Sequence, residues 1–467
     1  MTKVKINLIF QVFYQILQII LPVVTAPYVS RVLGVDNVGT YSYIYSVASY
    51  FVLFSMLGIN NYGNKLIASK KMNKTKVDEA FSNLFALHFI IAVSVLVLYI
   101  IYVCLFSENV KYGMIASLYL VGAIFDISWA FFGLEEFKIT VTRATIIRLV
   151  TIICIFVFVK APDDFWIYLL IMSCGTCISQ SIIWIIVPKY FTFVVPSWRQ
   201  MRDHIKPLLE LFIPVIAISL YKIMDKVMIR HLASTAQLGL YENAEKLINI
   251  PMGIITAVGM VMLPRAASLL SENNEISVKK SISDTIKYVM IIAFALAFGI
   301  AAIADDFVPF FFGNEFIGTS VMLKGLSITI PFLALANVIR TQYLIPKGNN
   351  RIYIGSVFCG AVVNLVANFI LIPRLLGNGA VIGTILAEAV VCLIQFVAVN
   401  RELSLVKDLR ASFPYMVIGF VMYLVVKLVG KMMFAGIFKI LIEMVCGVLI
   451  YGVLTLLVLY KRNGLSR

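Results

Sequence analysis

Charge is scarce in this sequence of 467 residues. Only 13% of the residues are Asp, Glu, Lys or Arg, 61% are hydrophobic, and the mean hydropathy is +0.96. A soluble domain carries about 25% charged residues, so this composition excludes a soluble fold. Apolar runs of about 20 residues, the length that crosses a bilayer as a helix, recur from end to end. The sequence therefore predicts an all-α polytopic membrane protein.

Catalytic and metal-binding motifs are absent as well. The sequence contains no GxxxxGK[ST], HExxH or GxSxG, and its three histidines lack the spacing of metal ligands. The predicted loops are short, about 20 residues at most, so none holds an ATPase or another catalytic domain. We predict no catalytic residue, no metal and no cofactor, and we expect that the protein is not an enzyme.

The seven cysteines and the positive charge have simple explanations. The cysteines lie almost wholly inside apolar runs, where Cys174 and Cys177 form a CxxC that favours helix packing over redox or metal chemistry. The net charge of +15 fits Lys and Arg gathered in cytoplasmic loops. No basic, aromatic-rich soluble domain is present to bind nucleic acid, so we predict no nucleic-acid partner.

The apolar runs predict about fourteen membrane spans. They lie at 7–32, 38–60, 80–105, 112–133, 142–160, 164–187, 208–231, 247–268, 284–304, 322–346, 352–373, 379–399, 411–429 and 436–460. Lys and Arg are concentrated in alternate loops, whereas one of the opposite loops has the sequence ADDFVPFFFGNEFIG. By the positive-inside rule, both termini lie in the cytoplasm of a multi-pass protein of the plasma (inner) membrane.

A faint internal repeat suggests how the spans are grouped. SRVLGVDNVGTYS follows the first span and IRHLASTAQLGLYE follows the seventh, so that Arg31 corresponds to Arg230. Two halves that run the same way through the bilayer have this pattern. We predict an N-lobe at 1–200 (spans 1–6), a C-lobe at 201–405 (spans 7–12) and two additional C-terminal spans at 406–467.

The seventh span has an unusual number of charges. SLYKIMDKVMIRHL (Ser219–Leu232) contains Lys222, Asp225, Lys226 and Arg230. On a helix these four side chains occupy one arc of about 140°. A charge facing lipid at the centre of a span costs about 2.5–3.5 kcal/mol, so the arc should face protein or water. Two interpretations remain: a cationic lining of a cavity, or structural pairing of Lys with Asp and snorkelling of Arg230.

Other polar residues fall inside predicted spans. Arg31 could join the same cationic lining or snorkel to the interface. Asn364 and Asn368 share a helix face and Glu388 lies in the next span, a pattern typical of hydrogen bonds between helices. Asp225 and Glu388 are also the candidate acids for ion coupling.

Several segments together resemble one family, the Wzx-type polysaccharide flippases of the multidrug/oligosaccharidyl-lipid/polysaccharide exporter superfamily. The segments, in order along nearly the whole chain, are SRVLGVDNVGTYSY, GINNYG, DISWAFFGLEEF, Asp225-Lys226, GLYENAEK, Pro264-Arg265, QYLIPKG, NLVANFILIP and GNGAVIGTILAE.

The resemblance implies two six-helix lobes around a central cavity, with two trailing helices. It also implies that the chain moves a polyprenyl-diphosphate-linked oligosaccharide to the outer leaflet by alternating access, for capsule or O-antigen synthesis. A polysaccharide polymerase is then a candidate partner, and a Na⁺ or H⁺ gradient a candidate driving force. The predicted cargo contacts are Lys222, Lys226, Arg230 and Arg31; only Asp225 and Lys226 match the family's motif directly. The alternatives are a cation-coupled multidrug exporter of the same superfamily and a membrane-embedded glycan polymerase.

Overall fold

The protein is entirely helical where it is described. The computed structural model describes the backbone of residues 3–272, 275–434 and 436–464; within these ranges it leaves out the side chains of residues 3–20, 214, 217, 218, 220–222, 271, 275 and 462–464. No strand occurs among the described residues. The predicted all-α fold class is confirmed.

The chain forms two compact units. Unit 1 comprises Met1–Leu21 and Val32–Val227, and unit 2 comprises Pro22–Arg31 and Met228–Arg467. Two long helices, α1 (Lys3–Met56) and α9 (Trp198–Leu232), contribute residues to both units. The division into lobes at 1–200, 201–405 and 406–467 stays a prediction.

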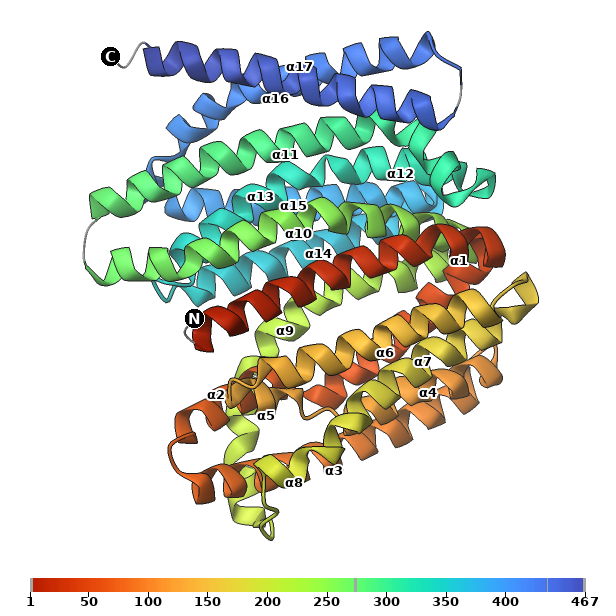
Figure 1. Ribbon diagram of the computed structural model, residues 1–467, viewed down its shortest axis with the longest axis vertical. Helices are drawn as coiled ribbons and strands as arrows, with labels where there is room; N and C mark the ends of the chain where they lie inside the picture. Colours follow the sequence, from red (N-terminus) through yellow and green to blue (C-terminus); the bar gives the residue numbers. More distant parts are fainter. Residues whose placement is uncertain (1–2, 273–274, 435, 465–467) are drawn as a thin grey trace. The chain divides into compact units, whose positions relative to one another are not determined.

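Unit 1 is a helical bundle in which α3, α4, α6 and α7 run side by side (Figure 1). Between α1 and α9 its elements are α2 (Ile59–Lys70), α3 (Lys74–Phe106), α4 (Val110–Ile124), α5 (Ser128–Gly133), α6 (Phe137–Phe158), η1 (Pro162–Asp164), α7 (Phe165–Ile182), η2 (Ile183–Ile185) and α8 (Val187–Tyr190). Asn73 and Asn109 begin α3 and α4, each accepting a hydrogen bond from the backbone N–H three residues later.

Two glycines break the first helices. Gly34 has φ 77° and ψ 172°, a conformation that is essentially open only to glycine, and it divides α1 into two limbs that match the first two predicted spans. Gly58 has φ 77° and begins α2. A Cβ on Gly58 would lie 3.0 Å from the Leu208 carbonyl oxygen of α9, so the backbones of α2 and α9 meet closely here.

The core of unit 1 is aromatic. Trp129 and Phe131 of α5 are fully buried and pack with Phe81 of α3, whose ring stacks on Phe191 with centroids 4.1 Å apart. The CxxC segment packs as predicted, because a Cβ on Gly122 of α4 would lie 3.1 Å from the Cys177 Cα of α7. The seven cysteines are free thiols.

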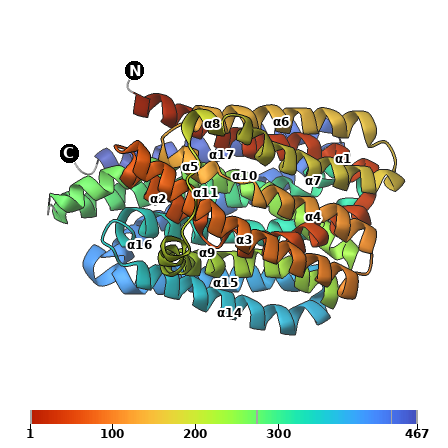
Figure 2. The ribbon, with the colours of Figure 1, turned by 90° about the horizontal axis from the view of Figure 1, so that it is seen from below.

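Unit 2 holds the remaining helices. They are α10 (Thr235–Ser271), α11 (Glu275–Phe312), η3 (Asn314–Phe316), α12 (Ile317–Ser327), α13 (Thr329–Ile339), η4 (Arg340–Leu344), α14 (Asn350–Leu375), α15 (Gly377–Leu403), α16 (Leu405–Lys431) and α17 (Ile437–Gly464). The α14–α15 pair lies side by side along its length (Figure 2). The α16–α17 pair packs on α11 through buried Tyr415, Met422 and Tyr451, and the Tyr451 hydroxyl donates to the Ile291 carbonyl oxygen at 2.8 Å.

The observed helices match the predicted spans. Twelve helical segments among the described residues are long and apolar enough to cross a membrane. One of them, Leu21–Lys70, contains parts of two predicted spans, which the break at Gly34 separates. The count leaves out α9, which is 35 residues long and includes residues outside the description. About fourteen long helices therefore correspond to the fourteen predicted spans. The longest connection among the described residues is 191–197, which agrees with the predicted short loops.

Candidate functional site

The charged stretch of the seventh span lies on one uninterrupted helix, α9. Asp225 is 3% exposed, and Lys226 and Arg230 are half-buried. The side chain of Lys222 lies outside the described residues. Asp225, Lys226 and Arg230 each interact with other groups of the protein. At these three positions the charged side chains of α9 thus contact other parts of the protein, and both interpretations of the stretch stay predictions.

Asp225 faces the second limb of α1 within unit 1. It lies close enough to Tyr50 for an electrostatic interaction between the carboxylate and the phenol. A carboxylate removed from water in this way needs a positive or hydrogen-bonding partner. Lys226 is the next residue along α9, on the same charged arc. The sequence motif Asp225-Lys226 thus places a buried acid beside a half-buried base.

Arg31 belongs to unit 2, and its side chain is exposed. Its Nη2 atom donates a hydrogen bond to the Phe310 carbonyl oxygen in the last turn of α11. A cation at the C-terminus of a helix is stabilised by the unpaired carbonyl groups there. Arg31 therefore caps α11 in this structure. Its predicted contact with cargo stays a prediction.

Glu388 lies on α15 of unit 2, one turn before Cys392, with whose thiol it interacts electrostatically. It is 5% exposed, and Asn364 and Asn368 on α14 are fully buried. The Asn368 side chain donates to the Asn364 side-chain oxygen at 3.2 Å, and a Cβ on Gly383 of α15 would lie 2.1 Å from the Asn368 Oδ1 atom. The two asparagine side chains thus lie where the backbones of α14 and α15 approach closely. Glu388 and Asn368 both have further interactions within the protein.

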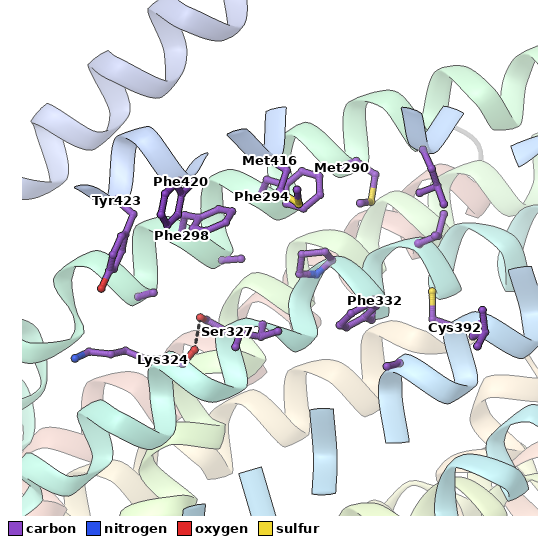
Figure 3. A pocket seen from close by; sticks show the side chains of 18 of the residues that line it. Met290, Phe294, Phe298, Lys324, Ser327, Phe332, Cys392, Met416, Phe420 and Tyr423 are labelled. Atoms are coloured by element: carbon purple, nitrogen blue, oxygen red, sulfur yellow. Dashed lines mark hydrogen bonds between the residues drawn. The ribbon is translucent and has the colours of Figure 1, made fainter. Parts of the chain in front are cut away.

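An apolar pocket of about 610 Å³ lies within unit 2, between α11, α12, α13, α15 and α16 (Figure 3). Phe294 and Phe298 of α11 lie across the pocket from Phe332 of α13. Lys324 and Tyr423 mark one end and Cys392 the other. Walls of this kind suit hydrocarbon and offer almost no hydrogen bonds to a sugar.

A network of charged side chains beside this pocket was missed by the sequence analysis. Its members, on α11, α12, α16 and α17, are Asp305, Asp306, Lys324, Lys427, Lys439 and Glu443. We call it the α11–α17 ion network. Four members were detectable signals, since each is a charged residue inside a predicted span: Lys324, Lys427, Lys439 and Glu443. Their partners were not detectable, because Asp305 and Asp306 were assigned to a loop, whereas α11 extends to Phe312.

No metal centre is visible among the described residues, where no group of three or more His, Cys, Asp or Glu side chains could hold an ion. Five carboxylate side chains are buried among the described residues: Asp78, Asp225, Glu242, Glu388 and Glu443. His88 is one of the three histidines, and its Nε2 atom lies 2.9 Å from the Ala123 carbonyl oxygen in the core of unit 1.

Comparisons with known proteins agree on a family and a fold. A family model described as "Polysaccharide biosynthesis protein" matches residues 4–270. A protein named "Putative O-antigen transporter" from Shigella dysenteriae is 24% identical over 388 residues, covering 81% of this chain and 96% of the relative.

Two solved structures have the same fold. The inward closed conformation of the lipid II flippase MurJ matches 99% of this chain and 100% of its own with a TM-score of 0.78 at 15% identity. An inward-facing multidrug resistance MATE family transporter matches 86% of this chain and 99% of its own with a TM-score of 0.63 at 14% identity. At these identities the likeness shows the fold alone.

Proposed function

The chain belongs to the polysaccharide biosynthesis protein family, and from this premise we propose that it is a flippase for lipid-linked oligosaccharides. Its cargo is a polyprenyl-diphosphate-linked repeat unit of a surface polysaccharide, of the capsule or O-antigen type. The O-antigen transporter named above supports this assignment, because it is similar to this chain over nearly its whole length.

The observation that carries the proposal is the charged arc of α9. Lys226 and Arg230 are half-buried beside the buried Asp225, in a helix of a membrane protein where such charges are costly. A diphosphate is a dense anion, and Lys and Arg are its usual partners in proteins. Together with Lys222 and Arg31, these cations form the proposed contact for the diphosphate.

The glycan and the lipid tail need different surroundings. A large polar glycan requires a wet path through the protein, which we propose alternates in access between the two sides of the membrane. The lipid tail stays in hydrocarbon. The pocket of unit 2 is apolar, so we assign no glycan contact to it.

The driving force is proposed to be an ion gradient or consumption of the cargo on the far side. The longest described connection is 191–197, too short for a nucleotide-binding domain. Asp225 and Glu388 are the candidate acids for coupling to Na⁺ or H⁺, because both are buried within membrane helices. A polysaccharide polymerase would consume the cargo in the outer leaflet and is the proposed partner.

Reconstitution tests the function directly. We expect the purified protein in liposomes to move a lipid-linked oligosaccharide between leaflets, so that the fraction open to an added glycosidase rises with time. Liposomes without the protein, and liposomes with an unrelated membrane protein, should show no such rise. The genes beside this one are to be identified first, because neighbouring glycosyltransferases would indicate which repeat unit to use.

Two outcomes would replace the proposal. No flipping, together with raised drug resistance in an exporter-deficient host, would favour the multidrug exporter, whose family has a related fold. Lengthening of the glycan by the purified protein would favour a polymerase.

The orientation is proposed to place both termini in the cytoplasm of the plasma (inner) membrane. The support is the excess of Lys and Arg in alternate loops, including the segments at 65–76 and 199–206. We expect a fluorescent protein fused after Arg467 to fold and fluoresce. Alkaline phosphatase inserted at Gly313, which ends α11, should be active outside the cytoplasm. The reverse pattern would overturn the orientation.

A further inference from the structure

The α11–α17 ion network lies at one end of unit 2, where the α11–α12 and α16–α17 connections are adjacent (Figure 1). One half of it is built on Asp305. Lys324 of α12 lies 2.5 Å from Asp305 Oδ1, and Lys427 of α16 lies 2.7 Å from Asp305 Oδ2. Two lysine side chains therefore pair with the Asp305 carboxylate, which is stable in its charged form.

The other half joins α11 to α17. Lys439 Nζ lies 2.7 Å from Asp306 Oδ1. Glu443 stands one turn further along α17 and is 1% exposed, and its carboxyl group lies close enough to that of Asp306 for an electrostatic interaction. The Oε2 atom of Glu443 is buried and receives no hydrogen bond from a protein donor among the described residues. Gly430 of α16 makes room for this carboxyl, since a Cβ there would lie 2.0 Å from Oε1.

Two carboxylates this close repel each other, and the buried Oε2 atom of Glu443 has no donor among the described residues, so a proton shared by the two carboxyl groups stabilises the pair. With one proton, the Asp306–Glu443 pair carries a single negative charge, which Lys439 balances. Without it, the pair carries two negative charges against Lys439 alone. Lys324 and Lys427 exceed Asp305 by one positive charge and lie in the same network, which makes loss of the proton attainable.

We propose that Asp306 and Glu443 form a proton-binding site, and that its occupancy controls how tightly the start of α17 packs on α11. The site is separate from the charged arc of α9, and the inference does not rest on the flippase proposal. The apolar contact of α16 and α17 with α11 around Tyr415, Met422 and Tyr451 keeps the helices together in both states. Loss of the proton therefore loosens only the end of the contact at which Glu443 is buried.

Infrared spectroscopy tests whether the proton is present. The purified protein is titrated from about pH 5 to about pH 9, a range that spans ordinary carboxyl groups and perturbed ones. We expect a protonated-carboxyl C=O band that persists well above the range of ordinary carboxyl groups and then disappears as the pH rises. The band should be missing at neutral pH from both Glu443→Gln and Asp306→Asn, since an amide donates to the remaining carboxylate without a shared proton.

Asp305→Asn is the matched control. It removes a neighbouring carboxylate but leaves the Asp306–Glu443 pair intact, so the band should remain at low pH. The pH at which the band disappears should fall, because Lys324 and Lys427 are then both unpaired. Two variants are made in case one of them misfolds. Either Glu443→Gln or Asp306→Asn alone completes the infrared test, provided that it elutes like the wild-type protein in size-exclusion chromatography. If neither variant folds, the test uses wild-type protein in which only the glutamate carboxyl groups are labelled with ¹³C. The proposal then requires the band to shift to lower frequency.

Hydrogen exchange tests the consequence. After correction for the intrinsic pH dependence, amides in the first turns of α17 should exchange several-fold faster above the transition than below it. The second half of α17 should not change. Absence of a titrating band in the wild type, or a band retained in both variants, would overturn the proton site. If hydrogen exchange at the start of α17 does not depend on pH, the proposal that the proton controls helix packing is wrong.

Discussion

Glutamine at Lys222, Lys226 and Arg230 together is expected to reduce delivery of the glycan to the outer leaflet by about 100-fold. A charge-assisted hydrogen bond contributes about 1.5–3 kcal/mol, and each 1.4 kcal/mol is a factor of ten, so loss of even two such bonds to a diphosphate has this effect. Glutamine keeps the length and polarity of the side chains, so the main change is the loss of charge. Surface glycan in a flippase-null cell is the measurement, at matched expression of the variant.

A second triple substitution on the same helix controls for charge. Arg199, Arg202 and Lys206 lie in the first turns of α9 and are exposed. Their change to glutamine removes the same charge from α9, and we expect near-complete rescue of surface glycan. Full rescue by the first triple variant at normal expression would defeat the proposed contact with the diphosphate.

Alanine at Gly379 is expected to give the largest loss of stability of any single substitution considered for this protein. A Cβ on Gly379, in the first turn of α15, would lie 2.5 Å from both the carbonyl carbon and the oxygen of Leu371 on α14. The obstacle is backbone, which cannot move aside as a flexible side chain would. Overpacking of this kind costs about 1–3 kcal/mol and occasionally more. We expect a large fall in the melting temperature of the purified protein and a lower yield of monodisperse material.

Gly355 provides the comparison for Gly379. It lies on α14, in the same helical pair, but a Cβ there meets nothing within 4 Å. Because alanine favours a helix over glycine by about 1 kcal/mol, Gly355→Ala should leave the melting temperature unchanged or raise it slightly. A melting temperature for Gly379→Ala equal to that of Gly355→Ala would show that the α14 and α15 backbones are not in the close contact described.

The helices were predictable because their signal is local. A run of about 20 apolar residues must form a helix if it crosses a bilayer, since each backbone N–H and C=O needs a partner within the segment. Even the break of α1 between the first two spans follows from local sequence, because Gly34 adopts a backbone conformation that other residues avoid. The seventh span was found in spite of its charges, since the apolar run at 211–221 is continued past Lys222 by Ile223, Met224, Val227 and Met228.

The contacts of charged residues were not predictable in the same way. Arg31 was placed with the α9 cations by a repeat in the sequence, whereas in the structure it donates to the Phe310 carbonyl oxygen, 279 residues away. Glu443 was not singled out in the last predicted span. Its relation to Asp306 depends on the packing of α17 against α11.

The sequence by itself determined that this protein is a bundle of helices long and apolar enough to cross a membrane, because hydropathy is a sum over neighbouring residues. Only the tertiary structure decided which charges meet. Asp305 and Lys427 are 122 residues apart in the chain, and Asp306 and Lys439 are 133 apart. The energy of an ion pair depends on a few ångströms of distance in space and on burial, and neither quantity is set by position along the chain.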